Sequence, residues 1–386
     1  MATEQRPAHS PLGASGAERW MNCLGSVALL RELKLPETDE PDYRSEGTTA
    51  HGAAYACLVD DLDGWEVLNQ KFGKHEVTPE MSDAIQMYLD ECRRVVLEHP
   101  GGTVYNEFGI DAPEFHKDFY GKLDRGYVVD TFMAIRDFKY GAGIAIDVEW
   151  NPQIMYYAYG LLRHHPEVET VELGIVQPRA FHGDGPIRLW TTSAQTIREW
   201  AENTLKPAMD ATALEHDLDA GSWCRFCPAK LVCPLMWNLF GAAMQTDPKQ
   251  VITLSDDMLG KSYHYLEAVK FFLKAFEEES FRRCNTGHKF QEIKLVQKKS
   301  NRVFKNGAQE VFVAKFGDEV YTEPHLKSPA EMEKLGQVAK DMVNEWAYKP
   351  DIGLTVVPRS DKRAEVIVKP ASETFAHLVD KPAQGE

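Results

Sequence analysis

Three short strand-like runs, a clear helix start and two further strands constrain the fold of this chain most. The first three runs are TVYNEFGI, FYGKLDRGYVV and TFMAIRDFK, with turn residues between them. Asn151-Pro152 then predicts a helix to about His165, because Asn caps free amide groups and Pro suits the first helical position. TVELGIVQP and PIRLWTT are predicted to be strands. This order predicts a mixed α/β core over roughly residues 45–215.

Further helices are predicted on both sides of this core. One begins near Thr48 in EGTTAHGAAYACLVDDL, and another covers residues 80–98, where apolar side chains recur at helical spacing. Residues 256–283 and about 329–347 are also predicted to be helical, among short strands. We therefore expect one domain over residues 1–240 and an α+β extension over residues 241–386, which binds DNA or closes an oligomer.

The hairpin GKLDRGYVVDTFMAIRDFK brings two acidic residues together. If Asp130-Thr131 form a two-residue turn, Asp124 lies directly across from Asp137. Like charges in such a pair are destabilising, so a bound cation is expected between them. Oxygen ligands of this kind favour Mg²⁺ or Mn²⁺. The alternative is a solvated hairpin face that carries two acids and binds nothing.

Lys139 follows Asp137 on the same face of the strand, because side chains two positions apart point the same way. A metal that lowers the pKa of bound water, beside a fixed ammonium group, suits phosphodiester hydrolysis. The pair therefore indicates a hydrolytic site if the cation is present.

Four other residues are candidates for the same site, although each also suits a structural role. His51 lies on the helix predicted from Thr48 and could bind the metal. Glu107 lies in the middle of a strand, where an acid needs a partner. Gln153 and Tyr157 are four apart, so they share one face of the helix that follows the acid–lysine pair.

Together these residues resemble the RecB-like branch of the PD-(D/E)xK nuclease superfamily. Its motifs G-x(3)-H, G-x-x-D, D/E-x-K and Q-x(3)-Y correspond to residues 47–51, 121–124, 137–139 and 153–157, in the family's order. The resemblance extends over about residues 19–235. It implies a restriction-endonuclease-like core, with a mixed central sheet flanked by helices, and a metal-dependent DNA exonuclease or end-processing hydrolase.

The resemblance also implies a role for each matching residue. The metal ligands would be His51, Asp124, Asp137 and the carbonyl of Phe138, with Glu107 as a further candidate. The catalytic set would be Asp124, Asp137, Lys139, Gln153 and Tyr157, of which the last two support the site and contact DNA.

The cysteines suggest a second metal site. Cys224, Cys227 and Cys233 are closely spaced, and a tetrahedral site needs a fourth ligand, for which Cys23 is the candidate. One early cysteine and a late triplet around the core resemble the iron–sulfur nucleases AddB and the CRISPR adaptation nuclease. This implies a [4Fe-4S] cluster that staples the two ends of the domain, with Zn²⁺ as the alternative.

The formal net charge is −16, which argues against a protein that coats nucleic acid by general electrostatics. Residues 281–305 are an exception, with eight basic residues against Glu292 alone. A basic segment on an acidic chain suggests contact with a polyanion, and a solvated hairpin is the alternative. The predicted nucleic-acid-binding residues are Arg282, Arg283, Lys289, Lys294, Lys298, Lys299, Arg302 and Lys305.

The chain further resembles a phage-associated group of these nucleases, through SGAERWMNC, DFKYGAG followed by NPQ, LKSPAEMEKL and VVPRSDKR. This implies a role in phage or prophage recombination, with linear single- or double-stranded DNA as substrate and an annealing protein or a helicase as partner. No transmembrane run or secretion signal is visible, so we expect the cytoplasm. The competing functions are a non-catalytic nucleic-acid-binding module and a regulatory subunit that binds zinc.

Overall fold

A computed structural model describes residues 6–7, 9–33, 42–214, 216–245, 255–322, 325–351, 353–358 and 363–368. Contacts divide the chain into two compact units, residues 1–271 and 272–386. The sequence predicts a boundary after residue 240, whereas the contacts divide the units after Phe271.

A five-stranded mixed sheet with the strand order β3-β4-β5-β6-β7 forms the centre of the first unit. Its strands are β3 (Thr103–Asp111), β4 (Tyr120–Val129), β5 (Phe132–Phe138), β6 (Thr170–Val176) and β7 (Ile187–Ser193). β5 and β6 pair in parallel and the other neighbours pair antiparallel. The predicted mixed α/β core is confirmed, with each strand in the expected segment.

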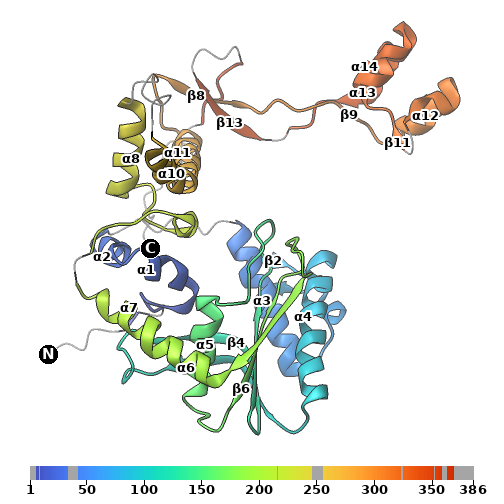
Figure 1. Cartoon of the computed structure of the whole chain (residues 1–386). Coiled ribbons are helices and arrows are strands. Elements are labelled where there is room, and N and C mark those ends of the chain that lie inside the picture. The colour runs from blue at the N-terminus through green and yellow to red at the C-terminus, as the bar shows by residue number, and fades with distance from the viewer. Residues whose placement is uncertain are drawn as a thin grey trace, which may run out of the picture. The chain divides into compact units, whose positions relative to one another are not determined.

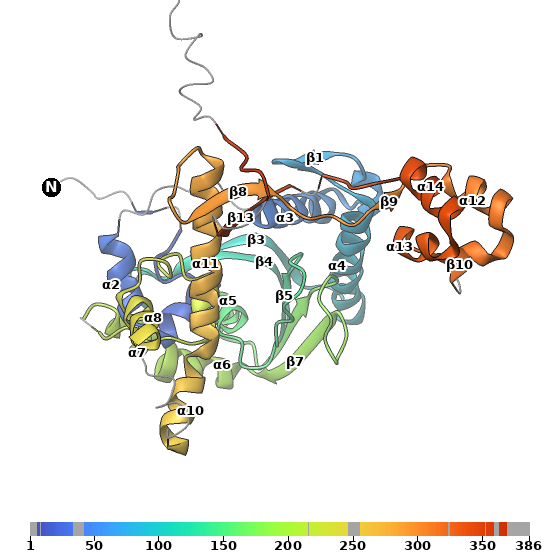
Figure 2. The same cartoon turned by 90° about the horizontal axis from the view of Figure 1, so that it is seen from above.

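Helices cover both faces of this sheet. α5 (Pro152–Leu162) lies on one face, and α3 (Asp42–Asp60) and α4 (Pro79–Glu98) lie on the other (Figure 1). Figure 2 shows the sheet curving around α5. Gly126 on β4 permits this close packing, because a Cβ atom there would stand 2.7 Å from a methyl group of Leu161.

The start of α5 agrees with its sequence. The side chain of Asn151 accepts hydrogen bonds from the amides of Gln153 and Ile154, and Pro152 is the first helical residue. α3, in contrast, begins at Asp42 rather than near Thr48. The hydroxyl of Thr48 donates to the carbonyl of Arg44 one turn earlier, so Thr48 lies inside the helix rather than capping it.

A buried ion network holds α4 against the sheet. Arg136 on β5 is 1% exposed, donates to Glu91 on α4 at 2.7 Å, and also pairs with Glu172 on β6. Removing one member would leave an uncompensated buried charge, so the network fixes β5 relative to α4.

The remaining elements of the first unit surround this core or precede and follow it. They are η1 (Ala14–Gly16), α1 (Ala17–Asn22), α2 (Gly25–Glu32), η2 (Gly64–Val67), β1 (Lys71–Phe72), β2 (His75–Glu76), α6 (Ala194–Trp200), η3 (Ala201–Leu205), α7 (Lys206–Ala211), η4 (Ser222–Phe226), α8 (Pro234–Gln245) and α10 (Asp256–His264).

The second unit contains both helices and strands. β8 (Ile293–Gln297) pairs antiparallel with β13 (Leu354–Pro358). Its other elements are β9 (Val303–Phe304), α12 (Ala308–Phe316), η5 (Gly317–Val320), β10 (Tyr321–Thr322), β11 (His325–Leu326), α13 (Pro329–Met332), η6 (Glu333–Leu335), α14 (Gln337–Trp346) and β12 (Ala347–Tyr348). α11 (Leu266–Asn285) crosses the boundary between the units, so the helix predicted over 256–283 is two helices, α10 and α11.

In the described part of the chain, no helix is both long enough and apolar enough to cross a membrane.

Candidate active site and cysteine pocket

The hairpin of β4 and β5 has the predicted register. Val129 pairs with Phe132 and Arg125 pairs with Arg136, so Asp130 and Thr131 form the turn. Asp130 has a φ of 47°, in the left-handed region that a tight hairpin turn requires. Beyond the last ladder pair, the amide of Phe138 donates to Asp124 Oδ2 at 2.9 Å. The hairpin therefore brings Asp124 to the end of β5 that carries Asp137.

Asp137, Lys139 and Gln153 form a closed set of polar contacts. Lys139 Nζ lies 2.9 Å from Asp137 Oδ2 and donates to Gln153 Oε1 at 2.9 Å. Gln153 Nε2 in turn donates to Asp137 Oδ1 at 3.2 Å. Gln153 is in the first turn of α5, so the Asn151-Pro152 helix start fixes its position. Through its hydrogen bonds Gln153 then orients both Asp137 and Lys139.

His51, Glu107 and Asp124 form a group with metal-ligand geometry. One ligand atom from each residue lies within 4.8 Å of the other two, and His51 Nδ1 is 3.5 Å from Asp124 Oδ1. His51 projects from α3, whereas the two acids come from neighbouring strands. One imidazole and two carboxylates could bind a divalent cation such as Mn²⁺ or Mg²⁺.

Glu107 is held in an unfavourable backbone conformation. Its φ is 46°, which is uncommon for a residue other than glycine. Asn106 pairs with Arg125 and Phe108 pairs with Leu123, so the register places Glu107 opposite Asp124. Strain of this kind clusters at functional sites, where surrounding structure maintains it.

The pKa values reflect crowding of negative charge. Burial raises the pKa of Asp137, and the neighbouring Asp124 adds to this effect although Lys139 opposes it. Burial followed by the charge of Asp124 also raises the pKa of Glu107. Burial alone would raise the pKa of Asp124. His51, Lys139 and the Phe138 amide outweigh burial, so the pKa of Asp124 is lowered. A bound cation would relieve the repulsion among these acids.

Asp137 is the most enclosed of the acids. Its side chain is 5% exposed, and within the described residues its Oδ2 atom accepts no hydrogen bond of good geometry, although Lys139 Nζ lies close to it. Asp137 thus stands beside the group formed by His51, Glu107 and Asp124 and faces Lys139 and Gln153. The carbonyl of Phe138 remains a predicted ligand.

Aromatic residues line the site from the protein interior. Tyr157 is 8% exposed, and burial raises its pKa far above the usual value, with Asp137 and Asp124 adding to the effect. The ring of Phe138 stacks on Tyr88 at 4.8 Å and lies 5.5 Å from His51. In the sequence, Tyr88 is one of the apolar residues at helical spacing in the segment that forms α4. This spacing predicts a core residue and does not indicate a contact with Phe138 at the site.

The four predicted cysteine ligands line one pocket. Cys23 directly follows α1, Cys224 lies in η4, Cys227 follows η4, and Cys233 directly precedes α8. The pocket encloses about 320 Å³, part of it open to solvent, and all four thiols are free of disulfides. Tertiary structure therefore brings the early cysteine to the late triplet.

Four cysteine sulfurs suit either a tetrahedral zinc ion or an iron–sulfur cluster, the two centres that the sequence predicts.

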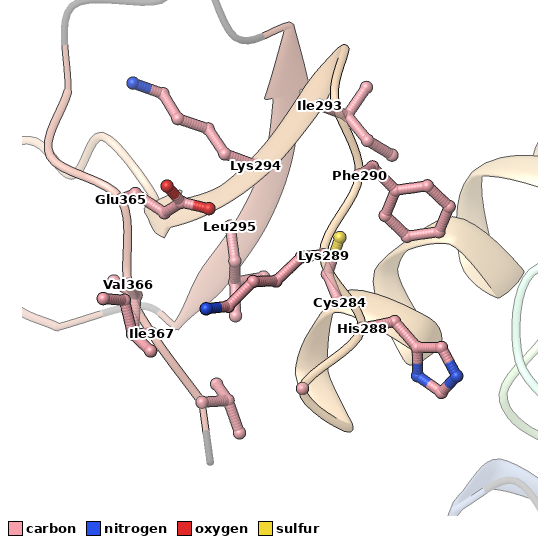
Figure 3. A pocket seen from close by; sticks show the side chains of 12 residues that line it. Cys284, His288, Lys289, Phe290, Ile293, Lys294, Leu295, Glu365, Val366 and Ile367 are labelled. Carbon is pink, nitrogen blue, oxygen red and sulfur yellow. The ribbon is translucent and has the colours of Figure 1, made fainter. Parts of the chain in front are cut away.

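The other cysteines lie elsewhere. Cys57 and Cys92 are buried in the core between α3, α4 and the sheet, where burial raises the pKa of each thiol to about 11. Cys284 is buried in the second unit and lines a different pocket (Figure 3). None of the three joins the predicted ligand set.

The eight basic residues of the segment 281–305 differ in their partners, and several of them are paired. Arg282 and Arg283 both bond to Glu279 on α11, at 2.6 and 2.7 Å, and Arg302 pairs with Glu333. Lys305 Nζ donates to the carbonyl of Glu345. These contacts, with acids and a carbonyl that the sequence did not associate with the run, offset part of its charge.

The remaining lysines of the run differ in their surroundings. Lys289 and Lys294 line the pocket shown in Figure 3, and Lys294 Nζ donates to the carbonyl of Arg363 at 2.7 Å. Lys298 and Lys299 are exposed, and neither has a carboxylate within 4.0 Å among the described residues. The latter two are the strongest candidates for contact with a polyanion.

Comparison with known proteins gives one family and two partial structural similarities. Residues 9–364 match the family described as "Protein of unknown function (DUF2800)". A candidate exonuclease from Eubacterium rectale is 15% identical, with a TM-score of 0.33, and the match covers 56% of this chain and 86% of that one. A protein named SSO0001 is 13% identical, with a TM-score of 0.19, over 55% of this chain and 94% of that one.

Proposed function

The chain belongs to the DUF2800 family, and we propose that it is a metal-dependent deoxyribonuclease of the PD-(D/E)xK type. One observation carries the proposal. Three strands and two helices from separate parts of the sequence contribute Asp124, Asp137 and Lys139 together with His51, Glu107 and Gln153. A solvated hairpin face would not need a buried carboxylate beside a lysine and an imidazole.

The donor set fits a divalent cation. His51, Glu107 and Asp124 offer one imidazole nitrogen and two carboxylate oxygens, and Asp137 lies beside them. When bound, the cation would lower the pKa of a water molecule and offset the charge that develops on the scissile phosphate. The pKa values of Glu107 and Asp137 are raised, and a bound cation would stabilise the ionised form of both carboxyl groups.

Lys139 supplies the second positive charge of the site. Its side chain is 22% exposed, so its ammonium can reach both the buried Asp137 and a substrate. Gln153 Oε1 holds it in place by accepting a hydrogen bond from Lys139 Nζ at 2.9 Å. A lysine held in this way can orient the attacking water through a hydrogen bond or stabilise the phosphate oxyanion.

The proposed substrate is linear DNA, cut from an end, in phage or prophage recombination. The motifs 47–51, 121–124, 137–139 and 153–157 support the nuclease assignment, and the phage-associated segments support the setting. Lys298 and Lys299 in the second unit would add contacts to the phosphate backbone.

We also propose that Cys23, Cys224, Cys227 and Cys233 bind a [4Fe-4S] cluster. The shared pocket supports a common metal centre, and the resemblance to iron–sulfur nucleases favours the cluster over zinc. Cys23 and the triplet are about 200 residues apart. The cluster would therefore close a long loop and hold the N-terminal segment to the end of the domain.

The test uses end-labelled linear and closed circular DNA, single- and double-stranded, with EDTA, Mg²⁺ or Mn²⁺ and anaerobically purified protein. We expect metal-dependent loss of the linear substrates, and a loss of activity of about 10²–10³-fold in Lys139→Ala. Lys117→Ala, an exposed lysine of the same unit, is the matched control and should cleave as the unaltered protein does.

Each result has a separate meaning. Cleavage of circular substrates at the same rate would exclude an end-dependent exonuclease but retain a nuclease. Equal cleavage by Lys139→Ala and the unaltered protein would refute the proposed active site. DNA binding without cleavage in any metal would favour a non-catalytic binding module.

A further inference from the structure

Arg19 is a half-buried cation in the cysteine pocket that lacks a carboxylate partner. It lies on α1 and lines the same pocket as the four cysteines. Its Nη1 atom donates to Ser26 Oγ at 2.7 Å, and among the described residues no carboxylate lies within 4.0 Å of it. Withdrawing a guanidinium group from water is costly unless an anion faces it. The arrangement therefore indicates that the pocket carries negative charge when the site is filled.

The other charged side chains of the pocket do not supply that anion. Asp219 lines the pocket, but its Oδ1 accepts a hydrogen bond from the amide of Ala220 at 2.7 Å. Lys230 adds a second cation and donates to the carbonyl of Arg225 at 2.7 Å. Burial lowers the pKa of Arg19, and Cys227 and Cys23, when ionised, would oppose this effect. Two cations and one acid thus surround four thiols.

The position of Arg19 is fixed by tight local packing around Cys23. Its hydrogen bond to Ser26 spans the cysteine, and Ser26 is 2% exposed. Gly25 permits close approach of the segment that leads to the cysteine triplet, because a Cβ atom there would stand 2.5 Å from the carbonyl oxygen of His216. The amide of Asp219 donates to Cys23 Sγ at 3.3 Å. Arg19 is therefore held in the pocket that the four cysteines line.

We propose that Arg19 is the positioning cation of the cysteine site, which retains the metal cluster and raises its reduction potential. The inference rests on the proposed cluster. Four thiolates around a [4Fe-4S] core leave net negative charge, and one-electron reduction adds to that charge. A fixed positive charge next to Cys23 and Cys227 stabilises the reduced form more than the oxidised form, and net charge is one determinant of the potential of such clusters.

The experiment compares the unaltered full-length protein with Arg19→Gln, Arg19→Lys and Arg31→Gln. Arg31 is the matched control because it lies on the neighbouring helix α2 and pairs with Asp118 at 3.7 Å. The measurements are iron and sulfide content, the rate of bleaching by EDTA under argon, and the midpoint potential in a dithionite titration with mediator dyes.

We expect Arg19→Gln to lose iron several-fold faster and to have a more negative midpoint potential. Arg19→Lys should restore most of the potential, which a merely structural role of the side chain would not do, and Arg31→Gln should match the unaltered protein. Equal potentials and equal rates of iron loss in Arg19→Gln and the unaltered protein would overturn the inference. If Arg19→Gln does not fold, Arg19→Met, which removes the charge and keeps an unbranched side chain, is measured in its place. A more negative potential in Arg19→Met supports the inference, and a potential equal to that of the unaltered protein overturns it.

Failure of the cluster proposal can be recognised separately. If the purified protein holds zinc and no iron, the cluster is wrong, and the role of Arg19 is decided by the rate of zinc release to a chromophoric chelator in the same variants. If the unaltered protein holds neither metal, both the cluster and this inference are wrong. The nuclease assay reports on the acid–lysine site and is read independently of these results.

Discussion

Asp124 and Phe138 are joined by a hydrogen bond of 2.9 Å from the backbone amide of Phe138 to the carboxylate of Asp124. The bond lies past the last ladder pair of β4 and β5, Arg125 with Arg136. It holds the carboxylate of Asp124 beside the residue that follows Asp137 on the other strand. The hairpin register and this hydrogen bond together orient Asp124 toward the end of β5 that carries Asp137.

Asp137→Asn should separate activity from stability. Burial holds the pKa of Asp137 above its unfolded value, so ionisation of this carboxyl destabilises the fold as the pH rises from the unfolded pKa through the folded pKa. Without added metal at pH 7, the variant should therefore melt at a higher temperature than the unaltered protein. With Mn²⁺, its cleavage should fall by at least about 10²-fold.

Melting curves and cleavage rates of Asp137→Asn are compared with those of Asp83→Asn, an exposed acid on α4. A lower melting temperature together with full cleavage would contradict both the buried environment of Asp137 and its place in the site.

Glu107→Gln should weaken metal binding without unfolding the protein. The substitution keeps the size of the side chain but removes one of the two carboxylates in the group of three candidate ligands. The pKa of Glu107 is raised, so protons compete with the metal, and Mn²⁺ affinity of the unaltered protein should increase as the pH rises through this titration. Calorimetric titration with Mn²⁺ at two pH values measures both effects. The same Mn²⁺ affinity in variant and unaltered protein would remove Glu107 from the ligand set.

Glu279→Gln should remove a pH-dependent part of the stability of α11. Hydrogen bonds from Arg282 lead the contributions that lower the pKa of Glu279 to about 2, with Arg283 adding to them. Because the folded pKa is depressed, this stabilisation is present above the unfolded pKa and is lost as the pH falls toward 2. Urea denaturation should show a less stable variant at pH 7 and a smaller difference at pH 3. Glu278→Gln, whose contact with Lys274 is 3.9 Å long and exposed, should differ little at either pH.

Lys298→Glu combined with Lys299→Glu should weaken DNA binding. Both side chains are exposed, and no carboxylate of the described residues lies within 4.0 Å of either. Loss of two phosphate contacts should lower the slope of log affinity against log salt by about 2. The control is Lys315→Glu on α12, which changes an exposed charge of the same unit outside the basic run. An unchanged salt slope in the double variant would leave the run without a role in DNA binding.

Much of the core and its acid pair could be predicted from sequence because local rules decide them. Short strand-like runs bounded by turn residues located the five strands, and Asn151-Pro152 located the start of α5. A two-residue turn at Asp130-Thr131 leaves one register for the hairpin, so the approach of Asp124 to the end of β5 followed from counting residues. The grouping of four cysteines followed from metal chemistry, which requires more ligands than the late triplet supplies.

Tertiary structure alone decided the features that depend on contacts between distant segments. The conformation of Glu107 depends on its place opposite Asp124, and the closeness of His51 depends on how α3 packs against the sheet. The pairing of Arg282 and Arg283 with Glu279 changed a run of positive charge into a partly neutralised one. Arg19 gave no signal in the sequence, because an arginine on a short helix is ordinary until the fold places it in the pocket of Cys23 and Cys227, with no carboxylate of the described residues within 4.0 Å. Sequence patterns report local geometry, whereas desolvation and charge pairing arise only when the packed chain brings separate segments together.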